Sequence, residues 1–227
     1  IVTGAGFGVH DADWIRRHLP EGGSAQLIEM TSARAVINLC GPKSREVLQA
    51  VSEENVSNRA FPFATAQDIT LGAATVRAVR IGYTGELGWE LHVPTEFALH
   101  VYDLLWQAGQ EHGIRDIGYR AIESLRLEKG YVYWSADITP DYSPVEAGLA
   151  GRVHLKSKED FLGRAILDRQ KRKGTSQQLC TFTVDERLPM TGGETILHKG
   201  KAVSLASSGG YGPTAEKTIV YGYLPTA

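Results

Sequence analysis

The sequence predicts an α+β fold, in which a ferredoxin-like subdomain is followed by a small antiparallel sheet or barrel at the C-terminus. Two observations support this class. The first part of the chain shows the order strand, helix, strand, strand, helix, strand, whereas a doubly wound parallel sheet would place a helix between the two central strands. The segment 177–227 contains four short strand-like runs separated by turn residues, which is typical of small antiparallel sheets.

The chain opens with an apolar start and three glycines, IVTGAGFGVHDADWIRRHL. Glycines followed by a helix are typical of loops whose backbone approaches a pyrophosphate. We interpret residues 10–19 as a helix capped by Asp11, so that the glycines precede the cap and do not open the helix. The strand-like runs 25–30 and 34–41 then follow one another without a helix between them. This order argues against a dinucleotide site.

The next elements are predicted from proline, glycine and apolar spacing. We expect a helix over 42–51, a hairpin of 66–71 and 75–83, a strand over 88–94, and a helix that starts at Thr95 or Glu96 and ends at Gly113. A further helix over 117–130 should end at Gly130, with Ile117, Ala121 and Leu125 on its apolar face. Residues 131–151 form a long loop or a domain connection. A short helix and four strands should complete the chain, over 163–174, 177–184, 193–198, 201–208 and 217–224.

Composition limits the function classes. The chain has 227 residues, with 24 basic and 26 acidic side chains and a net charge of -2, so we expect no nucleic acid partner and no membrane partner. Only Cys40 and Cys180 occur, which favours a reducing compartment: the cytoplasm, or the mitochondrial matrix in a eukaryote. The seven histidines are scattered, so we expect no metal site. Because the chain begins abruptly without Met, we expect a fragment.

The most informative candidate site is RIGYTGELGWELHVP, residues 80–94. Gly85 and Gly88 interrupt an apolar strand pattern, so the backbone should turn or bulge there. Glu90 follows in a strand, where a carboxylate must face solvent or find hydrogen-bond donors. Two interpretations stay open: a solvated hairpin residue, or an acceptor for a flat ligand edge with adjacent N–H groups, with Tyr83 as an aromatic wall.

Four sequence stretches resemble one family. YTGELGWELHVP, GYRAIESLRLEKGYVYWSADITPDYSPVEAGLA, FLGRAIL and EKTIVYGYL are similar to the folate-binding region shared by the glycine-cleavage aminomethyltransferase, or T-protein, and the sarcosine and dimethylglycine dehydrogenases. The likeness is greatest to the sarcosine dehydrogenase branch. It implies a T-protein-like folate-binding domain over 1–150, incomplete at its N-terminus, and a truncated aminomethyltransferase-type β-barrel domain over 151–227.

The resemblance also implies site residues and cofactors. Tyr83 and Glu90 would line the pterin site, and Tyr131 would lie against the folate. The cofactor would be tetrahydrofolate, with FAD in an upstream domain of the same parent chain as partner. No catalytic residue is expected in this chain, because the family's acidic catalytic residue lies upstream of Ile1.

One departure from the family pattern separates its branches. The aminomethyltransferases usually carry an Ala-Arg-Asp run before the folate tyrosine, whereas this chain has Ala121, Ile122 and Glu123. The missing arginine, together with Lys129 and Trp134, favours a flavin-dependent dehydrogenase that captures a one-carbon unit as methylenetetrahydrofolate. The alternatives are an aminomethyltransferase acting on a lipoyl carrier and a non-catalytic relative that keeps the fold.

Other charged residues are given structural roles. Asp137 and Asp141 are expected to shape the turn around Pro140 by side-chain to backbone hydrogen bonds. Arg126 and Glu128 are expected to form structural pairs on their helix, each worth little if exposed. We therefore predict no acid and base pair among these residues.

Overall fold

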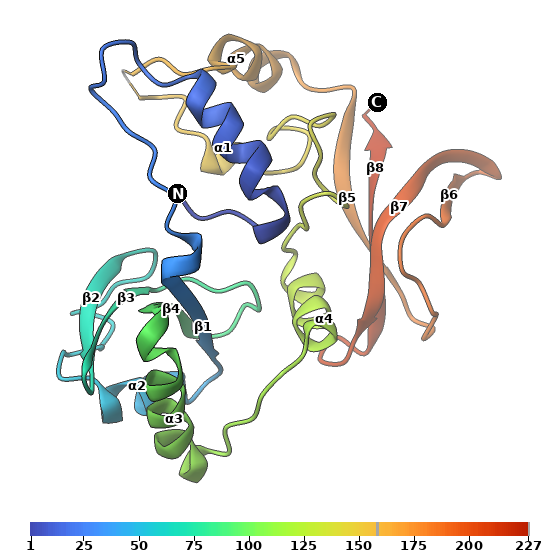
Figure 1. The fold of residues 1–227 in the computed structure, drawn as a ribbon. Coiled ribbons are helices and arrows are strands. Elements are labelled where there is room, and N and C mark those ends of the chain that lie inside the picture. Colours follow the sequence, from blue (N-terminus) through green and yellow to red (C-terminus); the bar gives the residue numbers. More distant parts are fainter. Residues whose placement is uncertain (158, 227) are drawn as a thin grey trace. The chain divides into compact units, whose positions relative to one another are not determined.

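The computed structural model describes residues 1–157 and 159–226. The chain forms two compact units whose segments alternate along the sequence (Figure 1). The first unit contains residues 1–39, 44–80 and 89–112, and the second contains residues 40–43, 81–88 and the chain from 113 onward. Each unit has its own four-stranded sheet.

The sheet of the first unit has the strand order β1-β4-β3-β2. Its strands are β1 (Arg34–Cys40), β2 (Ala66–Leu71), β3 (Ala74–Val79) and β4 (Gly88–Pro94). β3 pairs antiparallel with both β2 and β4. Burial alternates along the strands, so that every second side chain enters the core, as in Trp89, Leu91 and Val93 of β4.

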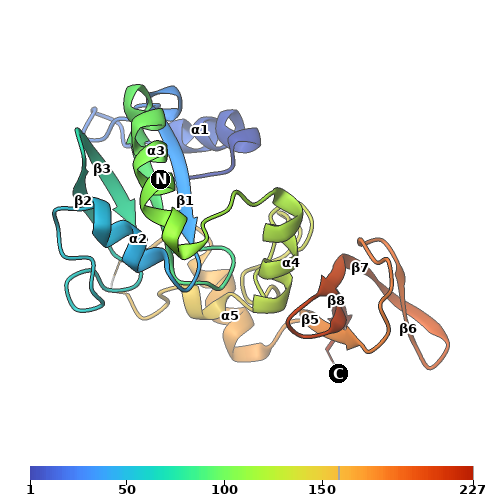
Figure 2. The same ribbon diagram turned by 90° about the horizontal axis from the view of Figure 1, so that it is seen from below.

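Two helices complete the core of the first unit. α2 (Ser44–Val51) and α3 (Ala98–Gly109) lie side by side against the sheet (Figure 2). They bury Val47, Leu48, Val101 and Leu105 at helical spacing. The core face of β4 is therefore covered, and its other face carries the residues that alternate with Trp89, Leu91 and Val93.

The sheet of the second unit has the order β5-β8-β7-β6 and is antiparallel throughout. Its strands are β5 (Gln177–Val184), β6 (Thr195–His198), β7 (Lys201–Gly212) and β8 (Lys217–Pro225). α4 (Tyr119–Lys129) packs on β7 and β8, and Leu127, Ile219 and Tyr221 form a shared apolar cluster. α5 (Arg164–Lys173) precedes β5.

The α+β class and the antiparallel C-terminal sheet predicted from the sequence are confirmed, and most predicted elements are present within a few residues. α4 ends at Gly130, which has φ +79°, as the glycine predicts. The division into domains at residue 150 stays a prediction.

Several sequence expectations about local structure are wrong. Residues 25–30 form no strand. α1 (Gly8–Arg17) begins three residues before Asp11, so Asp11 does not cap it. The Asp11 carboxylate instead accepts a hydrogen bond from the Thr3 hydroxyl and contacts His10. Gly8 is the first residue of α1, so the expectation that the glycines precede the helix without opening it is also wrong. Residues 1–4 form no strand before the glycines.

The apolar face expected for α4 is also wrong. The buried residues of α4 are Arg126 and Leu127, whereas Ile117 lies exposed before the helix and Ala121 is exposed on it. The apolar spacing was misleading because the helix buries a charged residue toward β7. No helix in the described ranges is long and apolar enough to cross a membrane.

Candidate functional site

Glu90 lies on β4, on the sheet face opposite to the core of the first unit. Its side chain is 23% exposed, and that of His92, two residues along the same face, is 13% exposed. The carboxylate oxygen Oε2 of Glu90 lies 3.7 Å from Nε2 of His92, which is beyond hydrogen-bond distance. Nε2 of His92 is buried and has no hydrogen-bond partner among the described residues.

This strand face therefore presents two polar groups with unused hydrogen-bonding capacity. A carboxylate that is mostly removed from water gains when a donor reaches it, and a buried ring nitrogen without a partner costs free energy. The neighbour of Glu90 on β3 is Val79, which offers no side-chain donor. The surroundings of Glu90 are thus compatible with a ligand that carries N–H groups.

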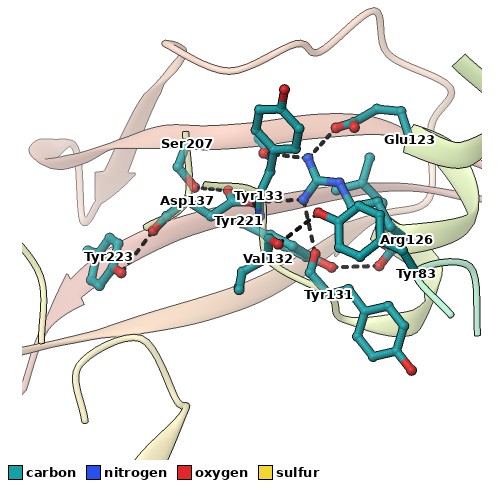
Figure 3. Close-up of polar contacts among 12 residues, drawn as sticks. Tyr83, Glu123, Arg126, Tyr131, Val132, Tyr133, Asp137, Ser207, Tyr221 and Tyr223 are labelled. Atoms are coloured by element: carbon teal, nitrogen blue, oxygen red, sulfur yellow. Dashed lines mark hydrogen bonds and ion pairs between the residues drawn. The ribbon is translucent and has the colours of Figure 1, made fainter. Parts of the chain in front are cut away.

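Tyr83 and Tyr131 form a stacked pair in the second unit. Their ring centroids are 5.9 Å apart and their planes differ by 14°, within the range of aromatic rings in contact. The Tyr83 hydroxyl donates a hydrogen bond of 2.7 Å to the carbonyl of Val132 (Figure 3). Burial raises the pKa of Tyr83 to about 12, so the phenol keeps its proton and uses it in this bond. Both residues are partly exposed.

The loop that carries Tyr83 depends on Gly85, which has φ +78°. A Cβ atom there would lie 2.7 Å from Cδ of Lys129 and 2.8 Å from its Cγ, because the aliphatic stem of Lys129 packs on this loop. The backbone turn predicted at this position is confirmed, whereas Gly88 simply begins β4. Lys129 thus has a packing role in addition to its charge.

A buried ion pair lies beside the two tyrosines. Nη1 of Arg126 is 2.7 Å from Oδ2 of Asp137, and the side chains are 1% and 0% exposed (Figure 3). Arg126 also donates to Glu123, to Ser208 Oγ over 2.8 Å, and to the carbonyl of Tyr131 over 3.1 Å. Burial opposes the charge of Arg126, but its carboxylate partners outweigh burial and raise its pKa.

Asp137 is satisfied from several directions. Besides Arg126 it accepts hydrogen bonds from the backbone N–H of Tyr133 over 2.8 Å and from Ser207 Oγ over 2.5 Å. The Tyr223 hydroxyl donates to its backbone carbonyl over 2.9 Å. A buried carboxylate with three donors is the arrangement that stabilises a charge away from water.

Sequence reasoning missed this pair. Asp137 does not serve the turn around Pro140, so that expectation is wrong. Arg126 does form structural pairs as expected, with Glu123 on its own helix and with Asp137, but it is buried and not exposed. Asp141 does bond locally, through Thr139. Glu128 accepts the backbone N–H groups of Thr214 and Ala215 over 2.6 and 2.9 Å.

The available signal for the pair was weak. Arg126 stands beside a core leucine in the last turn of α4, and Asp137 lies in an aromatic-rich segment eleven residues later. Neither position follows an apolar period, so only the fold brings the two charges together.

The fold is that of a two-unit α+β protein with a C-terminal antiparallel sheet, and family models assign it. Residues 1–157 match the GCVT N-terminal domain, and residues 177–227 match the glycine cleavage T-protein C-terminal barrel domain. The chain therefore belongs to the glycine cleavage T-protein family, as the sequence resemblance predicted.

Individual relatives agree. The chain is 45% identical to mitochondrial sarcosine dehydrogenase of Mus musculus over 88% of its own length and 22% of the relative. It is 35% identical to mitochondrial dimethylglycine dehydrogenase of Homo sapiens over 99% of its length and 26% of the relative. The structure of the glycine cleavage system aminomethyltransferase T from Bartonella henselae matches with a TM-score of 0.82 and 27% identity, over 97% of this chain and 59% of that one.

The chain thus spans about a quarter of the dehydrogenase relatives that it matches. No group of three or more side chains suited to bind a metal occurs in the part of the chain that the structure describes.

Proposed function

We propose that this chain is the tetrahydrofolate-binding portion of a flavin-dependent dehydrogenase that acts on an N-methyl amino acid, sarcosine or dimethylglycine. The observation that carries the proposal is the 45% identity to sarcosine dehydrogenase over most of this chain. The replacement of the transferase arginine by Ile122 adds to it. If the source is a eukaryote, the mitochondrial matrix is the expected compartment, as for the relatives named above.

Glu90 is proposed to bind the pterin ring. The ring carries adjacent N–H groups along one edge, and a carboxylate can accept two parallel hydrogen bonds from such an edge. The low exposure of Glu90, and the lack of a donor to it among the described residues, fit this role. The orphaned Nε2 of His92 is a second polar atom on the same face that a ligand could satisfy.

Tyr83 and Tyr131 are proposed to lie against the folate through their rings. The hydroxyl of Tyr83 is already bonded to Val132, so its contribution is an apolar wall and not a proton donor. Because Tyr83 stacks on Tyr131, the two rings would form one aromatic surface against the folate. Aromatic surface of this kind binds flat ligands and excludes water.

The chemistry follows from these roles. Tetrahydrofolate supplies the two nitrogens that take up a one-carbon unit as a methylene bridge. Residues of this chain bind and orient the folate, and restricting its orientation raises the rate of capture and limits loss of formaldehyde to water. The flavin would belong to another domain of the parent protein, and no residue in the described segments is assigned to it.

A second candidate is an aminomethyltransferase that acts on a lipoyl carrier. The TM-score of 0.82 to the Bartonella henselae enzyme supports it, because that chain shares the fold over nearly all of the described residues. The full-length natural protein separates the two candidates. Bleaching of a bound flavin by sarcosine or dimethylglycine supports the dehydrogenase, and aminomethyl transfer without flavin supports the second candidate.

The folate site is tested by Glu90→Gln, which keeps the shape of the side chain and replaces one acceptor oxygen with a donor. We expect the variant in the full-length protein to lose about 2 to 4 kcal/mol of binding free energy for tetrahydrofolate, measured by calorimetry. Glu96→Gln, at an exposed glutamate of the same unit, is the matched control and should bind normally. Unchanged affinity in a folded Glu90→Gln protein would remove Glu90 from the site.

A further inference from the structure

The buried pair of Arg126 and Asp137 lies next to the peptide units that carry the proposed folate tyrosine. We propose that this pair is a positioning element that fixes the backbone of residues 131–133 and thereby orients the Tyr131 ring for folate. The inference rests on the proposed function for its ligand. The contacts themselves are independent of any ligand.

Three consecutive peptide units are held in this segment (Figure 3). Arg126 donates to the carbonyl of Tyr131 over 3.1 Å. The Tyr83 hydroxyl donates to the carbonyl of Val132 over 2.7 Å, and the N–H of Tyr133 donates to Asp137 over 2.8 Å. The N–H of Tyr131 donates to the carbonyl of Arg126 over 2.9 Å. The segment directly after α4 therefore has few ways to move without breaking a bond to the ion pair or to Tyr83.

The ion pair is in turn fixed to the sheet. Ser207 Oγ donates to Asp137 over 2.5 Å, and Arg126 donates to Ser208 Oγ over 2.8 Å. Both serines belong to β7, which is paired with β8 along most of its length. The position of the 131–133 backbone is thus set by a strand far away in the sequence.

The Tyr131 ring itself has little else to orient it. Its side chain is partly exposed, and its hydroxyl forms no hydrogen bond to another described residue. The ring contacts Tyr83 by stacking, and Tyr83 is tied to Val132. Displacing the backbone should therefore move the two rings relative to each other, and the aromatic surface proposed to bind folate would lose its fixed orientation.

The test uses the full-length natural protein with two changes of graded strength. Ser207→Ala removes one donor to Asp137, and Asp137→Asn removes the charge. Ser207→Thr restores the hydroxyl and serves as the rescue variant. Glu128→Gln is the matched control, because Glu128 lies on the same helix and its hydrogen bonds go to Thr214 and Ala215 in the β7–β8 turn.

Two readouts separate positioning from stability. The first is the ring resonance of Tyr131 in protein labelled with ¹³C-tyrosine, assigned by its loss in Tyr131→Phe, which needs no folate. The second is the dissociation constant for tetrahydrofolate. We expect about threefold weaker binding in Ser207→Ala and about tenfold in Asp137→Asn, with a shifted Tyr131 resonance in both. Ser207→Thr should restore both values, and Glu128→Gln should change neither although its melting temperature falls.

Each outcome decides the proposal. A lower melting temperature in Ser207→Ala with an unchanged Tyr131 resonance and unchanged affinity overturns it, as does an equal effect of Glu128→Gln. If Asp137→Asn does not fold, Ser207→Ala and its rescue still decide. If the wild-type protein binds no folate while the resonance shifts as expected, the proposed function fails and the positioning of Tyr131 stands.

Discussion

Replacing Asp137 with asparagine should strongly destabilise the second unit. The substitution keeps the size of the side chain and removes a charge that is 0% exposed. Arg126, itself 1% exposed, would then keep only Glu123 as a carboxylate partner, and that side chain is 44% exposed. A buried charge left without its principal partner is one of the few mechanisms that produce a large loss of stability from a single substitution.

The magnitude follows from the partners that remain. Breaking a buried pair by removing one member costs about 3 to 5 kcal/mol. The lower end applies here, because Glu123 still neutralises part of the Arg126 charge and the asparagine amide can still bond to Ser207 and Tyr133. We therefore expect a loss of about 3 kcal/mol, which corresponds to a fall of roughly 6 to 12 °C in the melting temperature of this unit.

Hydrogen exchange followed by mass spectrometry is the suitable assay, because the two units need not unfold together. The amides of Tyr131, Tyr133 and Asp137, which are hydrogen-bonded in the wild type, should lose protection with α4 and β7. The double change Arg126→Met with Asp137→Leu should recover much of the loss, since it leaves no unpaired buried charge and the remaining Glu123 is 44% exposed. A loss below about 1 kcal/mol in Asp137→Asn would refute the reasoning that this pair holds the unit together.

Three further outcomes test local features. Gly72→Ala should destabilise the first unit by at least about 1 to 2 kcal/mol in urea unfolding, because φ is +57° and the new Cβ would lie 2.5 Å from the His100 ring; an unchanged midpoint would contradict this. Although burial alone would raise the pKa of Glu146, hydrogen bonds from Ser143 lower it below its usual value of 4.5. The carboxylate therefore stabilises the fold above its unfolded pKa, and this contribution should be lost in acid titrations that reach below pH 4.5. The loss should be absent in Glu146→Gln. Burial raises the pKa of Tyr83 and of Tyr221 from 10.0 to about 12, so stability should decline from pH 10 to about 12 as the unfolded chain loses these protons first, and Tyr221→Phe should weaken that decline in circular dichroism.

Most of the fold could be predicted from local sequence signals. Gly130 ends α4 because a left-handed residue closes a helix without strain, and the alternation in GWELHVP places Trp89, Leu91 and Val93 on one face of β4. The strand expected over 25–30 is absent, because this run lacks such a buried face. Leu27 and Ile28 are its apolar residues, but no residue of this run is buried, and Ile28 is 71% exposed.

The candidate site could be predicted only in part. Tyr83, Glu90 and Tyr131 were selected through a resemblance, and their roles stay predictions. The pair of Arg126 and Asp137 could not be predicted, because its stabilising contacts come from distant parts of the sequence. Ser207 is 70 positions from Asp137, and Ser208 is 82 positions from Arg126. Local patterns assign a charged residue to the surface by default, and only tertiary contacts reveal that its burial is compensated.

The pair also clarifies the departure from the transferase pattern at residues 121–123. The family run Ala-Arg-Asp has an acid at its third position, and Glu123 keeps an acid there, which pairs with Arg126 inside the second unit. In this chain, Glu123 thus contributes to the buried pair, and the difference in charge from that run is at Ile122. Ile122 therefore bears on the proposed choice between dehydrogenase and transferase, because it is the position at which the charge of this run differs.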